Sequence, residues 1–238
     1  MIKMKIAFVL RLVDDFSGMD IRRKKFVFSI GERVVHPIEK EEGLFVFLEP
    51  QEEETRVCIE GTDYYPCSAL IQKKLLNPDE PIAEIRMYGK VGKNLPYTYG
   101  VLGGVLKNKG TQLPAEVYAK RSKPTGLTLK EYRKAAGDWL ILQGFTQEKL
   151  LGKPYILEDG KETVAFILAE RRGINEYRVE FLGEPPKKLK AGIPLERIYR
   201  SVTDEKGAYA IPVDYGEEDL IQNVMIFHHR LLSKGRGG

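Results

Sequence analysis

The chain has 238 residues, enough for one large domain or two smaller ones with buried cores. Its 42% hydrophobic and 30% charged residues are typical of a globular protein and exclude disorder over most of the length. The net charge of +4 is a small difference between 38 basic and 34 acidic residues, which are mixed along the chain. We therefore expect no nucleic-acid partner. The basic run 22–25 fits either a phosphate-binding patch or a solvated loop, and we favour the loop.

The apolar N-terminal run is interrupted by Arg11 and followed by Asp14 and Asp15, so it predicts a strand rather than a signal peptide. No stretch has the length of a membrane helix, so we expect no membrane span. A cytoplasmic location at synthesis follows, with later release inside a particle left open. Cys58 and Cys67 lack CxxC spacing, and we predict reduced, partly buried thiols, with a disulfide as the alternative.

Strand patterns dominate the first ninety residues. Ile6, Phe8, Leu10 and Leu12 alternate with other residues, which is the period of a strand with one buried face. Similar runs recur about every ten residues, separated by turn residues, as is typical of a β-sandwich. These further runs are 26–30, 44–48, 56–60 and 82–88. The sequence therefore predicts a first antiparallel β-sandwich module over 1–90.

Glycine is dense in the next segment, and we predict a Gly-rich linker over 91–103. A second β-sandwich module over 104–238 follows, with an insertion at about 124–195. One short helix is expected in that insertion, because Thr128 and Glu131 fit a capping box and Gly137 would end the helix. Strands are predicted on either side of it, at 104–110, 113–119, 139–142, 163–168, 177–181, 198–202, 208–211 and 220–227. The predicted fold class is all-β.

One short segment occurs twice. In 41–47 and again in 205–211, a turn with a glycine precedes a strand that carries an aromatic residue two positions after the glycine. Gly43 and Gly207 are the expected structural turn positions, since a tight turn favours a positive φ. Phe45 and Tyr209 are then expected to lie in the cores of two related modules.

The second copy also suggests a family. Thr203–Ile211 resembles the "T-D-x-x-G-x-Y-x-I" turn of carboxypeptidase-regulatory-like, transthyretin-like β-sandwich domains, and Gly104–Ala119 resembles the opening hairpin of that family. Leu113 and Pro114 invert the usual order there, and the glycine before Ala115 is missing. The resemblance implies the fold. It also implies a setting, because such modules occur as adaptor, cap or baseplate pieces of phage-tail-like contractile injection particles.

No catalytic constellation is evident, and we predict a protein that is not an enzyme, without cofactor or metal. Histidine occurs only as His36, His228 and His229, and the adjacent pair would point to opposite faces of a strand. The acidic runs lack the alternating form of a calcium loop. Tyrosine is favoured at protein interfaces. The interface candidates are Tyr97, Tyr99, Gly100, Tyr64 and Tyr65.

The sequence thus predicts a structural or adaptor protein packed against other proteins of a large assembly, as a homo-oligomer or ring. Two other functions stay open: a surface-binding or carbohydrate-binding module, and an enzyme with a site between the modules. The fold alone does not decide between them.

Overall fold

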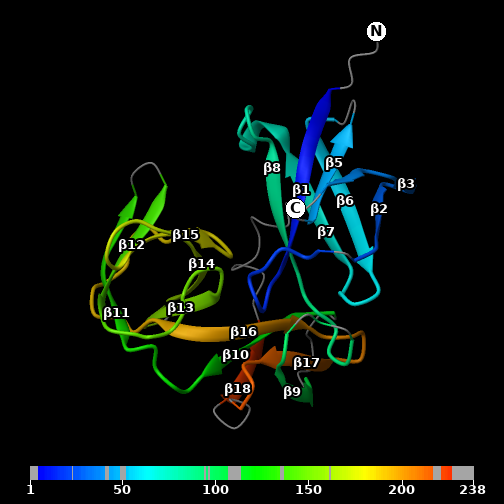
Figure 1. Cartoon of the computed structure of the whole chain (residues 1–238). Helices are drawn as coiled ribbons and strands as arrows, with labels where there is room; N and C mark the ends of the chain where they lie inside the picture. The colour runs from blue at the N-terminus through cyan, green and yellow to red at the C-terminus, as the bar shows by residue number, and fades with distance from the viewer. Residues whose placement is uncertain are drawn as a thin grey trace. The chain divides into compact units, whose positions relative to one another are not determined.

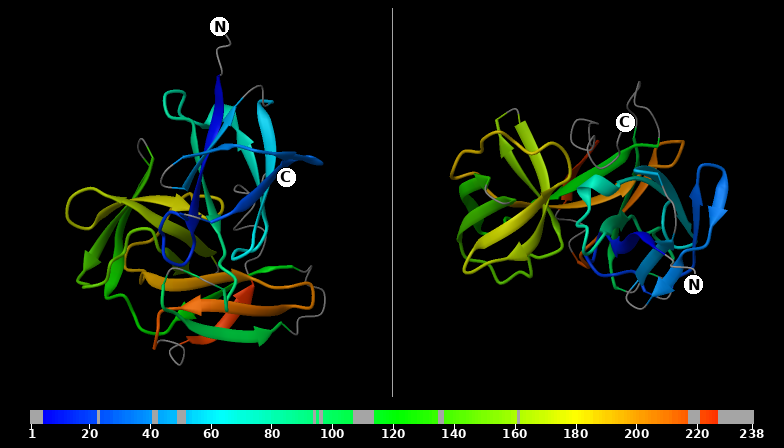
Figure 2. Two further views of the ribbon diagram at one scale, coloured as in Figure 1. Left: turned by 45° about the vertical axis from the view of Figure 1, so that its right-hand side comes forward. Right: turned by 90° about the horizontal axis from the view of Figure 1, so that it is seen from above.

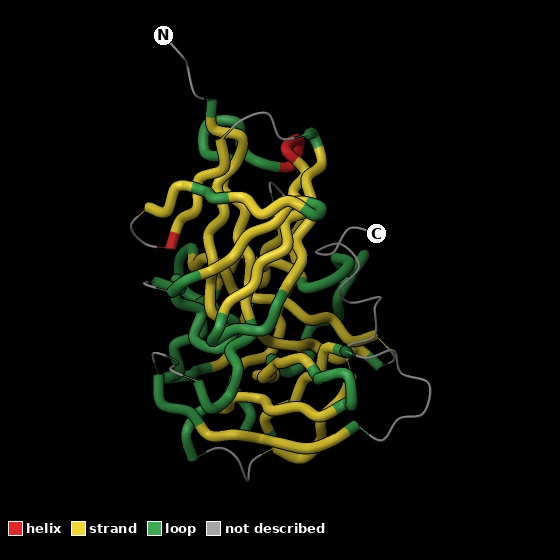
Figure 3. Tube along the Cα trace, turned by 90° about the vertical axis from the view of Figure 1, so that its right-hand side faces the viewer, coloured by secondary structure: helices red, strands yellow, loops and turns green. Residues whose placement is uncertain are grey.

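A computed structural model describes residues 5–22, 24–40, 43–48, 52–93, 95, 97–106, 114–134, 137–160, 162–216 and 221–226. Strands make up most of this part of the chain, and helical structure is limited to short 3-10 turns such as η2 (Lys73–Leu75) (Figure 3). The all-β prediction is confirmed. No helix of the described residues is long and apolar enough to span a membrane.

The chain divides into two compact units, Met1–Leu95 and Pro96–Lys234. The first unit is a sandwich of two four-stranded sheets, with strand orders β4-β5-β1-β8 and β3-β2-β6-β7 (Figure 1). All neighbours are antiparallel except β1 and β8, which are parallel. The strands are β1 (Ile6–Asp14), β2 (Phe26–Ile30), β3 (Arg33–Val35), β4 (Ile38–Lys40), β5 (Leu44–Leu48), β6 (Glu54–Gly61), β7 (Cys67–Gln72) and β8 (Ile82–Met87).

Alternating apolar residues account for the core of this sandwich. Phe8, Leu10 and Leu12 of β1 are buried, as are Val57 and Ile59 of β6, because successive side chains of a strand point to opposite faces. Ile6 departs from the expected pattern and is half exposed. The inner faces of the two sheets pack together around these side chains.

The second unit combines a small sandwich with a barrel. Strands β10, β16 and β18 form one layer and β9 with β17 the other. The remaining strands continue the first layer in the order β13-β14-β15-β12-β11. The strands are β9 (Gly100–Val105), β10 (Glu116–Arg121), β11 (Leu127–Lys134), β12 (Asp138–Gly144), β13 (Pro154–Asp159), β14 (Glu162–Arg171), β15 (Glu176–Phe181), β16 (Glu196–Val202), β17 (Ala208–Val213) and β18 (Ile221–Ile226).

The barrel closes through the segment that leads into β16. The Leu129 amide donates to the Ile193 carbonyl (2.8 Å) and the Leu195 amide to the Leu127 carbonyl (2.9 Å), while β16 itself pairs with β13. In Figure 1 and in the right-hand view of Figure 2 the green and yellow strands β11 to β15 curl into a ring. The barrel has its own apolar core, which includes Leu129 and Phe166. In the sequence, the five strands of the barrel, β11 to β15, are inserted between β10 and β16.

The predicted helix is wrong. Residues 127–134 form strand β11, paired over its length with β12 and interrupted by a register shift between Leu129 and Glu131. Leu127 and Leu129 are buried in the barrel core and Thr128 between them is only partly buried, which is the alternation of a strand. Lys130 and Glu131 are both exposed, at the register shift. A capping box stabilises a helix end by about 1 kcal/mol. Burial of the two leucines outweighs it, because each contributes about 1.5–3 kcal/mol.

The linker prediction is wrong for its last residues. Gly100, Gly103 and Gly104 lie inside β9, which pairs along its length with β17. The missing side chain explains Gly104: the Tyr209 ring, directly opposite in the register, lies against it and leaves no room for a Cβ atom. This covering of a strand glycine by a cross-strand aromatic ring is a known way to stabilise such positions.

Gly43 and Gly207 each precede a strand, β5 and β17, and both have a positive φ, 73° and 82°. Phe45 is buried in the core of the first unit. Tyr209 is only partly buried, so its expected core position is wrong. Its ring covers Gly104, and Ile211 and Val213 fill the core instead.

Candidate binding groove

A groove of about 370 Å³ opens between the two sheets of the first unit. It lies where β3 and β4, the edge strands of the two sheets, follow each other in the chain through His36 and Pro37. Its volume is within the range of small ligand pockets. The lining residues come from β2 to β5 and their connections: Lys25, Phe26, Val27, Phe28, Val34, Val35, His36, Pro37, Glu39 and Phe45.

Aromatic side chains form the apolar part of the groove. The rings of Phe28 and Phe45 lie 4.8 Å apart and those of Phe26 and Phe45 6.0 Å apart in an edge-to-face arrangement. Such pairs stabilise by about 0.5–1.5 kcal/mol beyond the area they bury. Phe26 lies over Gly61, its partner in the register, where a Cβ atom would come within 2.7 Å of the ring. The apolar wall is therefore held in a fixed geometry.

The rim combines charged and apolar groups. Lys25, His36 and Glu39 supply the polar lining. Val34 of β3 is 52% exposed and Ile38 of β4 is 44% exposed, so each edge strand presents an aliphatic side chain to solvent. An apolar hollow with convergent polar groups at its rim can bind an apolar side chain and orient the segment that carries it.

The predicted interface tyrosines do not form one surface. Tyr64 is buried in the first core, where burial, and next the Asp14 carboxylate, raise the pKa of its hydroxyl far above the ordinary value. It is therefore no surface residue. Tyr65 is half-buried beside Lys90, whose ammonium lies 6.0 Å from its ring centroid. Tyr97 and Tyr99 are also half-buried, with their rings 5.7 Å apart, edge to face, and Gly100 is buried at the start of β9.

Cys58 and Cys67 do not form a disulfide, and both are partly buried. Cys58 lies opposite Ser68, and Cys67 opposite Ile59, in the β6–β7 hairpin. Cys67 and Ile59 share one face of the sheet while Cys58 points to the other, because successive residues alternate. The Cys67 thiol lies 3.4 Å from the Met87 sulfur.

Acidic clusters serve the turns in which they occur. Asp14 accepts hydrogen bonds from the backbone amide and the hydroxyl of Ser17 (2.7 and 2.8 Å), and Asp15 pairs with Arg86 at 3.9 Å. In the basic run, Lys24 pairs with Asp63 at 2.6 Å and Arg22 with Asp20 at 3.8 Å. Within the described ranges, no group of three or more His, Cys, Asp or Glu side chains is arranged to hold a metal ion. His228 and His229 lie outside those ranges.

The groove was not among the sites that the sequence suggested. Its aromatic wall comes from the runs 26–30 and 44–48, which were predicted only as strands. The two short edge strands over 33–40, which line the rest of the groove, were not predicted at all. The sequence signal that could have indicated this groove is His36 beside Pro37, a polar residue and a turn residue between two apolar segments. Protein-family models, curated proteins and solved structures were compared with the chain, and none of them matches it.

Proposed function

We propose that this protein is a non-catalytic component of a larger protein assembly, and that it binds an extended segment of a partner protein at the groove between β3 and β4. The observation that carries this proposal is the apolar hollow, walled by Phe26, Phe28 and Phe45, that opens between two edge strands. An apolar anchor of the partner would fill it. Central anchors in pockets carry most of the free energy of a protein interface.

The edges of the sheets support a protein partner over a free small molecule. β3 and β4 end their sheets, so part of their backbone N–H and C=O groups face away from any paired strand. An extended segment can pair with such groups and place alternate side chains in the hollow. The exposed Val34 and Ile38 would become buried on either side of it.

The resemblance of Thr203–Ile211 and Gly104–Ala119 to transthyretin-like domains supports a particular assembly. Domains of that kind serve as adaptor, cap or baseplate pieces in phage-tail-like contractile particles. We propose the same setting here, with synthesis in the cytoplasm and repeated copies around a ring.

Site-specific photocrosslinking tests the proposal. A benzophenone amino acid replaces Val34 in the full chain, and in a control it replaces Leu75, which is even more exposed (72%) but lies in η2, away from the groove lining. In cells of the native host, we expect a discrete protein adduct at position 34 with at least about tenfold higher yield than at position 75, as befits a specific anchor site. Mass spectrometry of the adduct identifies the partner.

Val34→Lys should remove the partner from pull-downs with the tagged full chain, because it places a charge at the rim of the apolar groove. Leu75→Lys should not. Equal crosslinking at both positions, or adduct formation with no protein at all, contradicts the groove as the partner site.

A further inference from the structure

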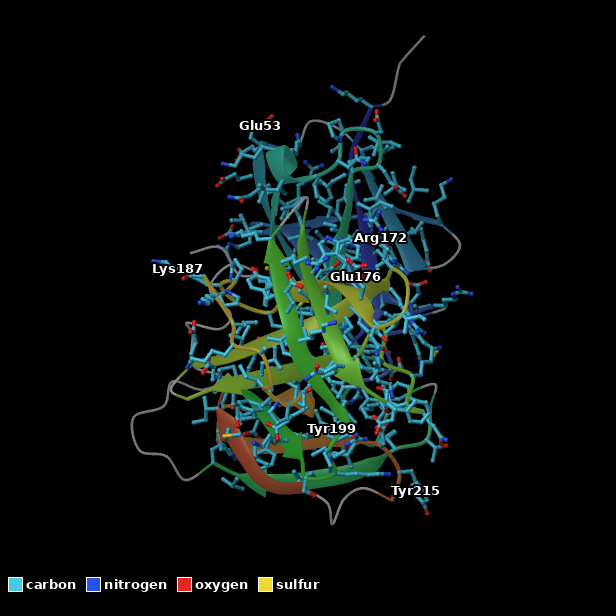
Figure 4. The ribbon with its side chains drawn as sticks, turned by 90° about the vertical axis from the view of Figure 1, so that its left-hand side faces the viewer. Glu53, Arg172, Glu176, Lys187, Tyr199 and Tyr215 are labelled. Carbon is cyan, nitrogen blue, oxygen red and sulfur yellow. The ribbon has the colours of Figure 1, made fainter. Side chains whose placement is uncertain are left out.

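A buried arginine lies at the junction of the barrel and the small sandwich. Arg197, Tyr199 and Ser201 alternate along β16 and share one face of the strand. Arg197 is 1% exposed and lies opposite Tyr155 of β13 in the strand register. Tyr155 belongs to the barrel core, whereas the Tyr199 hydroxyl reaches Asp214, just after β17. Tyr199 is labelled in Figure 4.

The Arg197 guanidinium lies beside two aromatic rings and makes no well-formed hydrogen bond to a described residue. Its central carbon lies 5.0 Å from the Tyr199 ring centroid and 5.9 Å from that of Tyr155. None of its three nitrogens is hydrogen-bonded to any described residue, and the same holds for the buried Ser201 hydroxyl. Its charge, and next its side-chain interaction with the Tyr155 hydroxyl, lower the pKa of that hydroxyl, against a larger effect of burial that raises it, to about 12. That hydroxyl carries no charge to balance the guanidinium.

Such an arrangement is unfavourable for the protein alone. A buried ionised group without a partner is strongly destabilising, and guanidinium cannot lose its proton at ordinary pH. Contact with two aromatic rings offsets only part of this desolvation. Buried polar groups of native proteins nearly all have partners, so an unpaired guanidinium points to an anion that the chain itself does not supply.

The charged side chains around Arg197 do not neutralise its positive charge. Arg121 is paired with Glu148 at 2.6 Å, and Asp214 accepts a hydrogen bond from Tyr199 at 2.7 Å. Lys153 lies within the same field: burial, and next Arg197, lower the pKa of its ammonium, while Asp214 and Glu148 raise it. Arg121 and Glu148 therefore neutralise each other, whereas no described carboxylate pairs with Arg197, whose charge remains uncompensated.

We propose that Arg197 forms a binding site for one carboxylate group. A planar carboxylate matches the fork of the guanidinium and neutralises the single excess charge. The carboxylate can come from a free small acid or from a partner chain. This site lies in the second unit and is independent of the proposed groove.

Thermal unfolding of the full chain with different sodium salts, at constant ionic strength, tests this site. We expect acetate at about ten times its dissociation constant to raise Tm by about 3–6 °C relative to chloride. Arg197→Met should abolish this rise. It should not lower Tm in chloride, because it replaces an unpaired buried charge with an apolar side chain of similar length. The control Arg133→Met, at an exposed arginine paired with Glu131, should keep the full acetate response.

Binding of acetate at Arg197 can also be measured directly in the folded protein, without thermal unfolding. The Arg197 Nε–H resonance, identified by its loss in Arg197→Met, should shift on titration with acetate. Peptides with free C-termini, compared with their amidated forms, distinguish the two sources: binding at least tenfold tighter than acetate indicates a carboxylate on a partner chain. Binding of acetate alone indicates a free small acid.

Three results would overturn the proposal. One is an equal acetate effect on the parent protein and on Arg197→Met, which indicates a general salt effect. Another is a response to phosphate but not to acetate. The third is a large loss of Tm for Arg197→Met in chloride without any acetate shift of the resonance, because the guanidinium is then satisfied within the protein.

Discussion

At the scale of single residues, two glycines owe their place to an aromatic ring on the neighbouring strand. Gly61 lies under Phe26 and Gly104 under Tyr209. Neither has a positive φ, so backbone freedom is not the reason for glycine at these positions. What matters is the absent Cβ atom, which lets the ring lie flat against the strand.

Gly104→Val therefore should destabilise the protein by about 1–3 kcal/mol, the range of overpacking, although valine favours strands. The adjacent Gly103→Val is the matched control, because its Cβ atom meets only the Tyr209 carbonyl oxygen at 3.8 Å, an ordinary contact. Urea unfolding of both variants gives the two losses in the free energy of unfolding, and the loss for Gly104→Val should be the larger. Removal of the ring in Gly104→Val/Tyr209→Ala should recover part of the loss, and strict additivity of the two changes would contradict this explanation.

At the scale of elements, β11 holds the barrel closed. Its Leu129 donates to Ile193 and also accepts from the Gly192 amide (2.7 Å), while the side chain is fully buried. Leu129→Ala should reduce the free energy of unfolding by about 2–5 kcal/mol. The neighbouring Lys130→Ala should change it by less than about 0.5 kcal/mol, because that side chain is exposed. Comparable losses in both variants, measured by urea unfolding, would argue against strand geometry here.

At the scale of the whole molecule, two units with separate cores should unfold separately. Phe45→Ala removes a buried ring from the first core and should lower one calorimetric transition, at a loss of about 3–5 kcal/mol. Leu129→Ala should lower the other transition alone. A single transition that shifts with either variant would show that the two units unfold cooperatively.

Much of this fold could be predicted from the sequence, because half-buried strands carry their pattern locally. The runs 26–30 and 44–48 match β2 and β5 in both bounds. Five strands were not anticipated: the short edge strands β3 and β4, β7 after Cys67, β11, where a helix was expected, and β13, which begins at Pro154. In β13 the first four residues are all buried, so its apolar run shows no alternation.

The failures share a physical cause, which is that the deciding partner lies far away in the chain. The helix signal around Thr128 was local, whereas the strand depends on burial against β12 and on the segment 192–195. Gly104 of β9 is explained by Tyr209, about a hundred residues later. The Arg197 cluster likewise combines residues of β10, β13, β16 and the end of β17, which no short motif could reveal.

The insertion of the barrel between β10 and β16 also sets an order of events during synthesis. Inside the barrel, β11–β12, β13–β14 and β14–β15 are sequence neighbours that can pair as soon as they leave the ribosome. β9 and β10, which emerge earlier, must wait for β17 and β16. For that interval the nascent chain exposes two unpaired strands, a state that favours misassociation with other chains. Barrel closure brings the partner of β10 first, because the segment 192–195 that completes the ring runs directly into β16. The exposure of β9 ends only when β17 follows.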